Sequence, residues 1–508
     1  PSATLDLQAA LTAATLDLDG TISNTAGTSS LIISGTSSLG GSITTTGTQT
    51  YNNAVTLTGD TTLATSSAQV TFAANATINS EGSETNNLTI TASETELNGV
   101  IGYTRTLGVI DINGNLDLNA AITNATSMDV SGTANLGADV TTSGNQTYSG
   151  AVILSTNVSL SGGNQLLFGG TVNSSDTDST SDARTLTTTF TETELDGIIG
   201  GTYALGAMDI NGALDLDAAI TNATSMDVSG TANLGADVTT TGTQAYQDAV
   251  TLSADVILTT TDSNITFTST LRSDAAESAR DLTVNLDANS DGTSADLILN
   301  GVVGGVSLPL DVISITGDLD LNASIGNSPG ATSIIVSGDT NLGADVETTS
   351  TQTYQGAVTV SADITLTTTN SNIDFDAIVN ADTAGRALTL AAGSGDVTFD
   401  NAIGGSTALG NLNITTGALT AGAIKAQGTI TVNNSASSAI TGIISDGATA
   451  AILTKTGAGT LTLSGTNTYT GDTTISAGTL KLTGNLNSAT NLVIAPSATL
   501  DLQAALTA

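Results

Sequence analysis

A short acidic segment at residues 287–296, which reads DANSDGTSAD, holds the residue types best suited to binding a metal ion. Carboxylate and amide oxygens alternate along it and Gly292 follows them, an order typical of the start of a calcium-binding loop. The bidentate Glu that closes such a loop is missing, because Ile298 stands in its place. We predict a calcium site here, and the alternative is an acidic surface turn. The candidate ligands are Asp287, Asn289, Asp291, Thr293 and Asp296.

Aspartates also recur in LDL and MDV units, and one hypothesis is a ladder of cation ligands along one face. A ligand cage needs side chains that converge, which a repeated spacing does not provide by itself. We therefore favour solvated strand edges or turns that add charge and limit aggregation. The repeated positions include Asp117, Asp129, Asp215 and Asp227.

The composition excludes several classes of protein. The net charge is −39 with only eight Lys and Arg residues, so a nucleic-acid partner is disfavoured because phosphate recognition needs a basic surface. The chain has no His and no Cys, which excludes disulfides, thiolate metal sites and histidine-based catalysis. No apolar run of about 18 residues is present, and we expect no membrane-spanning helix. We predict no catalytic residue and no cofactor-binding residue.

The elements that must position these side chains are short β-strands. Hydrophobic residues make up 39% of the chain and recur in alternating runs bounded by Gly, Asn, Asp or Ser. The runs return with a regular short period, as from Ile112 to Val130 and from Val130 to Tyr148. A period of about 18–21 residues per coil predicts an all-β fold, a right-handed parallel β-helix or β-solenoid shaped as an elongated rod or fibre. The side chains expected to point inward are the pairs Val55 and Leu57, Val152 and Leu154, Val250 and Leu252, and Val358 and Val360.

A longer repeat divides this continuous solenoid, residues 1–508, into modules. The segment that begins at Asp111 returns with few changes at Asp209, 98 residues later. We expect approximate modules at 14–106, 107–204, 205–306, 307–410 and 411–495. Residues 496–508 are identical to residues 1–13, which predicts that the next unit of a 495-residue tandem array starts there.

Aromatic and arginine residues keep step with the modules. One tyrosine in each could be an exposed contact point, although packing at a coil corner with the hydroxyl reaching solvent is favoured; these are Tyr51, Tyr148, Tyr246 and Tyr354. The aligned phenylalanines are expected in the core; they are Phe72, Phe168, Phe267 and Phe375. Three arginines are expected to form local ion pairs with the surplus acids; they are Arg184, Arg280 and Arg386.

From Lys455 the chain reads KTGAGTLTLSGTNTYTGDTTISAGTLKLTG, which resembles the passenger-associated repeat of bacterial autotransporters. The matching positions include Gly457, Leu461, Asn467 and Tyr469. The TGTQTYxxAVTL and GDVTFDNAIGG segments make most of the remaining chain similar to large secreted exoproteins of the filamentous haemagglutinin type. The resemblance implies a right-handed parallel β-helix in a secreted or cell-surface protein of a Gram-negative bacterium, with a role in adhesion, biofilm structure or surface display.

The sequence therefore predicts a non-catalytic structural or adhesive repeat region of an extracellular fibre, which continues coil on coil. Expected partners are neighbouring copies, end to end or in lateral bundles, and cell-surface or matrix glycans. Calcium is the only cofactor considered. One alternative is a polysaccharide-binding or polysaccharide-degrading β-helix. The other is an ice-binding solenoid, because ITTT at Ile43 and LTTT at Leu258 and Leu366 resemble flat threonine arrays.

Overall fold

The structure, a computed structural model, describes residues 3–25, 27–175, 183–275, 278–287, 295–305, 308–326 and 330–503. Every regular element in this part of the chain is a β-strand. Among these residues no helix has the length and apolarity needed to span a membrane. The chain divides into two compact units, Pro1–Gln247 and Asp248–Ala508, which are described separately.

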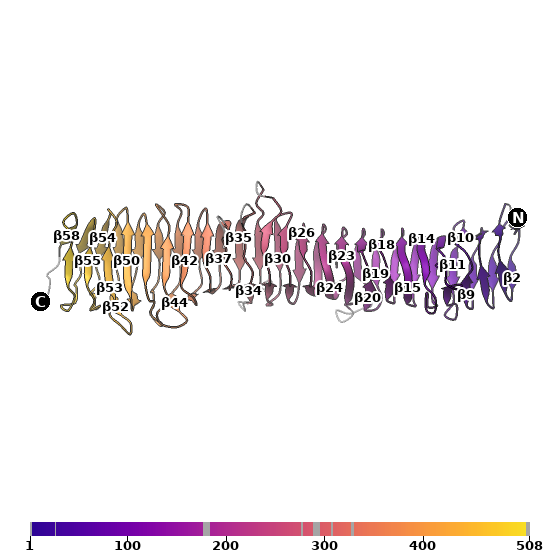
Figure 1. The fold of residues 1–508 in the computed structure, drawn as a ribbon, viewed down its shortest axis with the longest axis horizontal. Helices are drawn as coiled ribbons and strands as arrows, with labels where there is room; N and C mark the ends of the chain where they lie inside the picture. Colours follow the sequence, from indigo (N-terminus) through magenta and orange to yellow (C-terminus); the bar gives the residue numbers. More distant parts are fainter. Residues whose placement is uncertain are drawn as a thin grey trace. The chain divides into compact units, whose positions relative to one another are not determined.

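One coil of the first unit contains three short strands, β8 (Gln49–Tyr51), β9 (Val55–Leu57) and β10 (Thr61–Thr65). The next strand, β11 (Gln69–Phe72), returns to β8 and pairs with it in parallel. In the same way β9 pairs with β12 (Ile78–Ser80) and β10 pairs with β13 (Leu88–Leu97). Figure 1 shows the strands of this unit, coloured indigo to magenta, side by side in successive coils. This is the parallel ladder of a β-solenoid.

The predicted fold class is confirmed as an all-β parallel solenoid, with about 23 turns and about 21 residues per turn. Coil length varies around this mean. The step from Thr4 to its partner Thr21 is among the shortest, and the step from Ile265 to its partner Leu297 is among the longest. The longer coils exceed the predicted period because insertions fall between strands. Residues 81–87, for example, lie between β12 and β13, and both strands keep their parallel partners.

Alternation of buried and outward residues along most strands builds the core. In β9, Val55 and Leu57 are buried while Thr56 between them is only partly covered. Successive side chains of a strand point to opposite faces, so apolar residues at every second position form stacked rows inside the coil. All four predicted inward pairs are buried, which confirms them: Val55 and Leu57, Val152 and Leu154, Val250 and Leu252, and Val358 and Val360.

Three successive modules of the first unit use the three sides of the coil in turn. Tyr51 lies on β8, and the parallel register places Tyr148 in the row of Leu63 on β10. The parallel pairings that lead back from β28 (Gln244–Tyr246) through successive coils place Tyr246 in the row of Val55 on β9. We call these sides face A, face B and face C, after Tyr51, Tyr148 and Tyr246. The sequence between two successive tyrosines therefore does not make up a whole number of coils. As a result, each of these modules is rotated about the axis by one side of the coil relative to the module before it.

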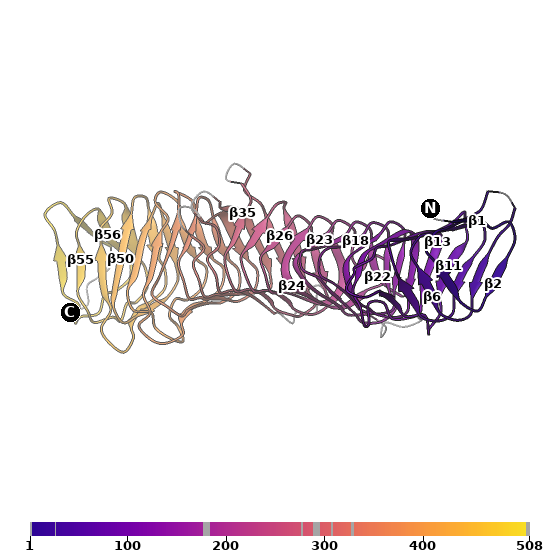
Figure 2. The same cartoon turned by 45° about the vertical axis from the view of Figure 1, so that its right-hand side comes forward.

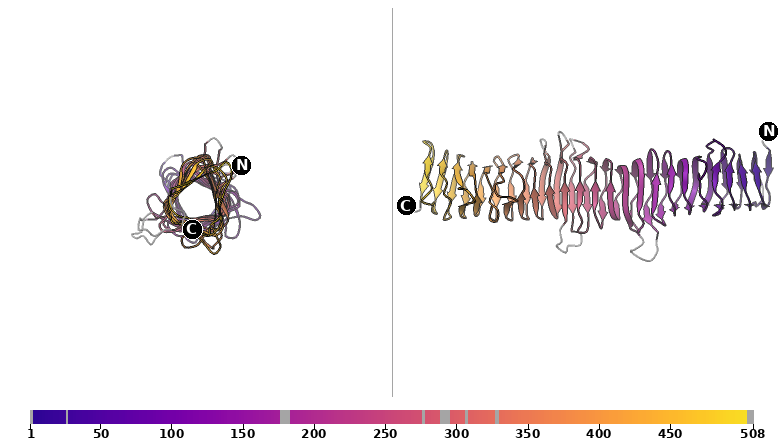
Figure 3. Two further views of the ribbon diagram at one scale, coloured as in Figure 1. Left: turned by 90° about the vertical axis from the view of Figure 1, so that its left-hand side faces the viewer. Right: turned by 60° about the horizontal axis from the view of Figure 1, so that its bottom comes forward.

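The second unit is built in the same way. β40 (Gln352–Tyr354) pairs in parallel with β43 (Ile373–Phe375), which pairs with β46 (Val397–Phe399). The rings of Tyr354, Phe375 and Phe399 stack inside these coils, with centroids 5.3 Å and 4.7 Å apart. Figure 2 shows β50 (Thr429–Asn434), β55 (Thr473–Ile475) and β56 (Thr479–Leu482) side by side near the C-terminus. The end-on view shows the yellow coils of this unit closing around its axis (Figure 3, left).

Candidate functional site

A buried hydrogen-bond network recurs at the four Gln-x-Tyr (QxY) motifs of the sequence, which begin at Gln49, Gln146, Gln244 and Gln352. In the first, the Gln49 side-chain Nε2 donates to the main-chain oxygens of Ala64 (2.9 Å) and Ile43 (3.2 Å) and to Thr45 Oγ1 (3.3 Å). The Tyr51 hydroxyl donates to Gln49 Oε1 (3.1 Å), and Thr45 Oγ1 donates to Gly47 O (2.7 Å). The network joins adjacent coils and satisfies its polar groups, so it stabilises the corner without a burial penalty.

Gln146 with Tyr148 and Gln352 with Tyr354 repeat this network. The prediction that the tyrosines pack at corners is confirmed, whereas the prediction that their hydroxyls reach solvent is wrong. Each hydroxyl is buried because the glutamine two residues earlier supplies an internal acceptor. Burial raises the pKa of all four tyrosines well above the ordinary value; they are Tyr51, Tyr148, Tyr246 and Tyr354. The four predicted core phenylalanines are buried, as expected; they are Phe72, Phe168, Phe267 and Phe375.

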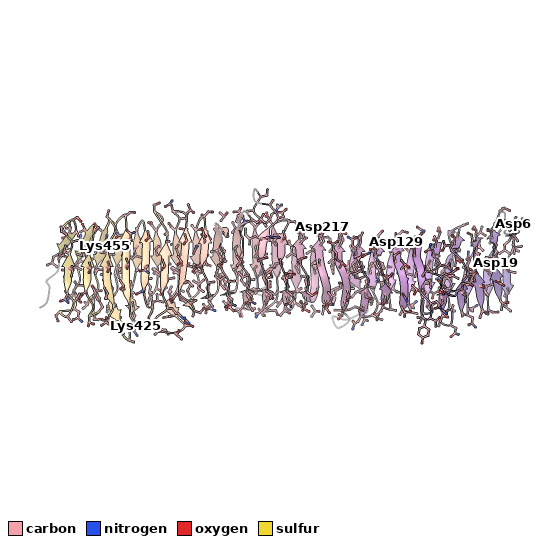
Figure 4. All side chains as sticks on the ribbon, in the orientation of Figure 1. Asp6, Asp19, Asp129, Asp217, Lys425 and Lys455 are labelled. Atoms are coloured by element: carbon pink, nitrogen blue, oxygen red, sulfur yellow. The ribbon has the colours of Figure 1, made fainter. Side chains whose placement is uncertain are left out.

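Near the C-terminus, a buried lysine makes the hydrogen bonds at a corner of the coil. Lys455, the last residue of β53 (Ile452–Lys455), is completely buried, and its ammonium donates to the main-chain oxygens of Gly457 and Ala477. Burial lowers the pKa of Lys455 to about 8. Figure 4 marks Lys455 on the C-terminal coils. Sequence reasoning did not single out this charge, although a lysine at an inward position of an alternating strand is a detectable signal.

The outward aspartates of the LDL units pair with amides. Asp117 accepts hydrogen bonds from Asn135 Nδ2 (2.8 Å) in the next coil and from Asn119 Nδ2 (3.1 Å). Asp215 accepts one from Asn233 Nδ2 (2.8 Å). These carboxylates are therefore engaged in Asp–Asn ladders along the outer surface, an arrangement that favours the structural interpretation over a cation ladder.

A group of five carboxylates in the first unit lies around Glu194 on β23 (Leu186–Leu195). Partial burial and then the neighbouring carboxylates raise the pKa of Glu194, and Gln165 Nε2 donates to it at 2.5 Å. The neighbouring carboxylates are Asp196, Asp215, Glu192 and Asp217, of which Figure 4 marks Asp217. Across the described residues, no group of three or more carboxylates has the arrangement that a metal ion needs.

The predicted calcium loop is described only at its two ends. Asn289, Asp291 and Thr293 lie outside the described residues. Asp287 lines a hollow of about 340 Å³ together with Asp318 and Asp339. Asp296 lines a second hollow of about 330 Å³ that shares both of these aspartates. Partial burial, followed by Asp318 and Asp320, raises the pKa of Asp296. The calcium site stays a prediction.

The threonine runs do not form flat outer arrays. Thr45 and Thr368 turn into the coil and are buried. The outward Thr44 lies opposite Ala64 in the adjacent coil, which interrupts any threonine row. An ice-binding surface needs an extended, regular outer array, and these threonines do not build one.

Two of the three predicted arginine ion pairs are present. Arg280 makes a bidentate pair with Asp274, at 2.9 Å and 3.1 Å, and Arg386 makes one with Asp382, at 2.8 Å and 3.1 Å. Each arginine holds the pKa of its partner carboxyl below the usual value, chiefly through the hydrogen bonds. For Arg184, whose neighbours 176–182 lie outside the described residues, the ion pair stays a prediction.

A loop that follows β13 and Ile101 presents an exposed aromatic ring. Asn79 Oδ1 accepts the main-chain N–H groups of Thr104 (2.8 Å) and Arg105 (3.1 Å). Gly102 has φ = 72°, and a Cβ there would lie 2.1 Å from Asn124 O, so only glycine fits. Tyr103 projects from this loop with 71% of its surface exposed. Sequence reasoning missed Tyr103, although it is one of the tyrosines outside the QxY motif.

The comparisons with known proteins bear on β53 to β56. Residues 453–482 match the passenger-associated-transport-repeat. This segment comprises most of β53 together with β54 (Thr460–Leu463), β55 and β56, and it contains Lys455 and Tyr469. No curated protein and no solved structure matches the chain.

The passenger-associated-transport-repeat and the parallel solenoid together fit the β-helix repeats of autotransporter passengers. Within residues 453–482, the Tyr469 hydroxyl shares a hydrogen bond with Thr473 Oγ1 (2.5 Å), and burial raises the pKa of Tyr469 to about 12. Asn467 Nδ2 donates to the main-chain oxygens of Gly465 (3.1 Å) and Asn485 (3.0 Å). The polar residues of this repeat thus act as internal ties between coils. A repeat of this family is typical of secreted or cell-surface proteins.

Proposed function

We propose that the chain is a non-catalytic structural and adhesive region of an extracellular or cell-surface fibre of a Gram-negative bacterium. The observation that carries the proposal is the parallel pairing of successive coils along the described residues of each unit, combined with segments that recur along the sequence. Each added coil buries an aliphatic row and completes the main-chain hydrogen bonds of the coil before it. Repeated modules give such a fibre many copies of any surface feature, which raises avidity.

Electron microscopy of the native material tests this proposal. We expect long, thin filaments whose width matches one coil, or bundles of such filaments. Compact monomeric particles would contradict it. The net charge of −39 predicts that lateral bundling increases when salt screens the repulsion between filaments.

We further propose that the modules continue as a tandem array of a 495-residue unit. In support, the described part of the repeated 13-residue segment contains a paired strand at both of its occurrences. Leu5 on β1 (Thr4–Asp6) pairs with Ile22, and the equivalent Leu500 on β58 (Thr499–Leu502) pairs with Leu480. The mass of the denatured native polypeptide distinguishes the two routes to a fibre. Many array units in one chain indicate a covalent array, and a single unit indicates end-to-end assembly.

Calcium binding at residues 287–296 is a separate proposal. It is supported by the alternating oxygen ligands and by the acidic hollows that Asp287 and Asp296 line. Calorimetry at millimolar calcium is expected to detect uptake that Asp291→Asn abolishes. The absence of uptake by the unaltered chain would remove this site.

A further inference from the structure

The exposed aromatic side chains of the described residues are restricted to one type of loop. Of seven tyrosines, five are fully buried, whereas Tyr103 is 71% exposed and Tyr203 41% exposed. All six phenylalanines are buried and the chain has no tryptophan. The two loops are equivalent, because each begins at a glycine with positive φ, Gly102 or Gly200, and is held by an asparagine, Asn79 or Asn173. Tyr203 takes the loop position of Arg105, whereas Tyr103 directly follows its glycine. The two exposed rings of the described residues therefore lie on equivalent loops at different positions.

The loop that carries Tyr103 faces a second anchored loop, and the two enclose a hollow of about 320 Å³. The second loop is fixed by Asn86, whose Nδ2 donates to Leu57 O (2.7 Å) and whose N–H donates to Ser80 Oγ (2.9 Å). Both walls are therefore held by hydrogen bonds to the coil, exposed ones from Asn79 on the Tyr103 side and buried ones from Asn86 on the other. The hollow is preformed and has the size of a small ligand site.

The lining of this hollow combines one ring with groups that bind hydroxyls. Besides Tyr103, the lining residues include Arg105, Glu84 and Asn124, together with three threonines, Thr85, Thr104 and Thr106. In the described residues Arg105 makes no ion pair and no side-chain hydrogen bond, although the chain has only eight cationic side chains. Five guanidinium donors are thus available to a bound molecule.

We propose that this hollow, formed by Tyr103, Arg105, Glu84 and Asn124, binds a saccharide. The apolar face of a pyranose ring stacks on Tyr103, while Arg105, Glu84 and Asn124 exchange hydrogen bonds with its ring substituents. A peptide segment would need an apolar cleft or an open sheet edge, and this hollow offers neither. The proposal deepens the adhesive role proposed above and rests on it.

The equivalent loop in the second unit has no aromatic residue, and it shows that the loop conformation does not depend on the tyrosine. There Asn380 Oδ1 accepts the N–H groups of Ser406 (3.0 Å) and Thr407 (3.3 Å), and Gly404 has φ = 68°. The scaffold is therefore independent of the residue it presents. Tyr103 is not needed to fold its loop, which makes a substitution there a clean probe of binding.

The test is titration of the purified chain with four saccharides at physiological salt. Chitotetraose and maltotetraose are the neutral probes, and tetragalacturonate and sialyllactose are the acidic probes. We expect at least one to bind, Tyr103→Ala to weaken that binding about tenfold or more, and Tyr103→Phe to preserve it. If the ligand is acidic, Arg105→Ala weakens it by a similar factor; if it is neutral, Arg105→Ala has the smaller effect. The control, Ile153→Ala, replaces another exposed side chain and should change nothing.

Failure of all four saccharides to bind, or unchanged binding by Tyr103→Ala, would overturn the proposal. Circular dichroism and thermal melting confirm that each variant is folded. The result is distinguishable from failure of the fibre proposal, because filament formation is observed by microscopy without any saccharide. If filaments form but bind no saccharide, only the saccharide site is refuted. If the particles are compact, only the fibre proposal is refuted.

Discussion

The solenoid closes its inner corners in two ways. In the first unit, Gln49 and Tyr51 form a neutral network in which every donor has an acceptor. In the passenger-associated-transport-repeat of the second unit, the buried ammonium of Lys455 binds two main-chain carbonyls with no carboxylate among its hydrogen-bond partners. Both arrangements satisfy carbonyl groups at a turn, but only the second places a charge in the interior, at a cost in desolvation. The comparison teaches that one fold accepts either a neutral or a titratable corner.

The largest expected difference comes from removing the tyrosine ring. Tyr51→Ala leaves a cavity beside Phe72, whose ring centroid lies 5.0 Å from that of Tyr51, and should cost about 3–5 kcal/mol in the free energy of unfolding. Tyr51→Phe keeps the packing and loses one hydrogen bond, which should cost about 1 kcal/mol. Urea unfolding followed by circular dichroism measures both. Tyr103→Ala, on the exposed loop, is the matched control and should stay within about 0.5 kcal/mol. Equal effects of Tyr51→Ala and Tyr103→Ala would refute a structural role for the corner.

The second prediction distinguishes the Lys455 corner from the Gln–Tyr corners by how the free energy of unfolding depends on pH. Lys455 loses its proton near pH 8 in the folded protein, whereas a lysine in the unfolded chain holds it to about pH 10.4. The unfolded state binds more protons between these values, so the free energy of unfolding should rise there with pH, by about 1–3 kcal/mol. Urea unfolding of the whole chain at pH 7.5 and pH 9.5 measures the rise.

Lys455→Met should abolish this rise, because it removes the titrating group. The Gln–Tyr corners should behave oppositely above about pH 10, where unfolded tyrosines ionise but the buried ones, with raised pKa, do not. The free energy of unfolding should therefore fall again above about pH 10. A profile that is flat from pH 7.5 to pH 9.5 in the unaltered chain would show that Lys455 is not buried as a cation.

The smallest expected effect concerns the hydroxyls that complete each corner. Thr45→Val removes one of the three acceptors of Gln49 Nε2 and the donor to Gly47 O, and Thr473→Val removes the partner of the Tyr469 hydroxyl. Each change keeps the side-chain volume and should cost about 1–2 kcal/mol, because it removes at least one hydrogen bond from the corner. Differential melting of the two variants measures the effect. A stabilising result for either would show that its corner tolerates an unsatisfied group.

Alternation in the sequence was enough to predict the core, because side chains at every second position of a strand must share a side. Val55 and Leu57 follow from this rule alone. The burial of the Tyr51 hydroxyl does not follow from this rule, because it depends on Gln49, two residues earlier on the same strand, which supplies the acceptor. Lys455 was missed because a cation is normally placed outside, and only the carbonyls of Gly457 and Ala477 make its burial tolerable. The turn of one face per module depends on the exact coil lengths, which vary with insertions such as residues 81–87 and which the repeat spacing does not reveal.

The turn of one face per module has a consequence for how the surface loops meet a target. Ile101, which precedes the Tyr103 loop, lies in the row of Tyr246, whereas Ile199, which precedes the Tyr203 loop, lies in the row of β11 and β16 (Ala134–Leu136). The two loops therefore leave the coil at different azimuths. A flat surface laid against one side of the coil would therefore meet only one of these two loops at a time. If the loops bind a ligand as proposed, they present it to different directions around the axis of the first unit.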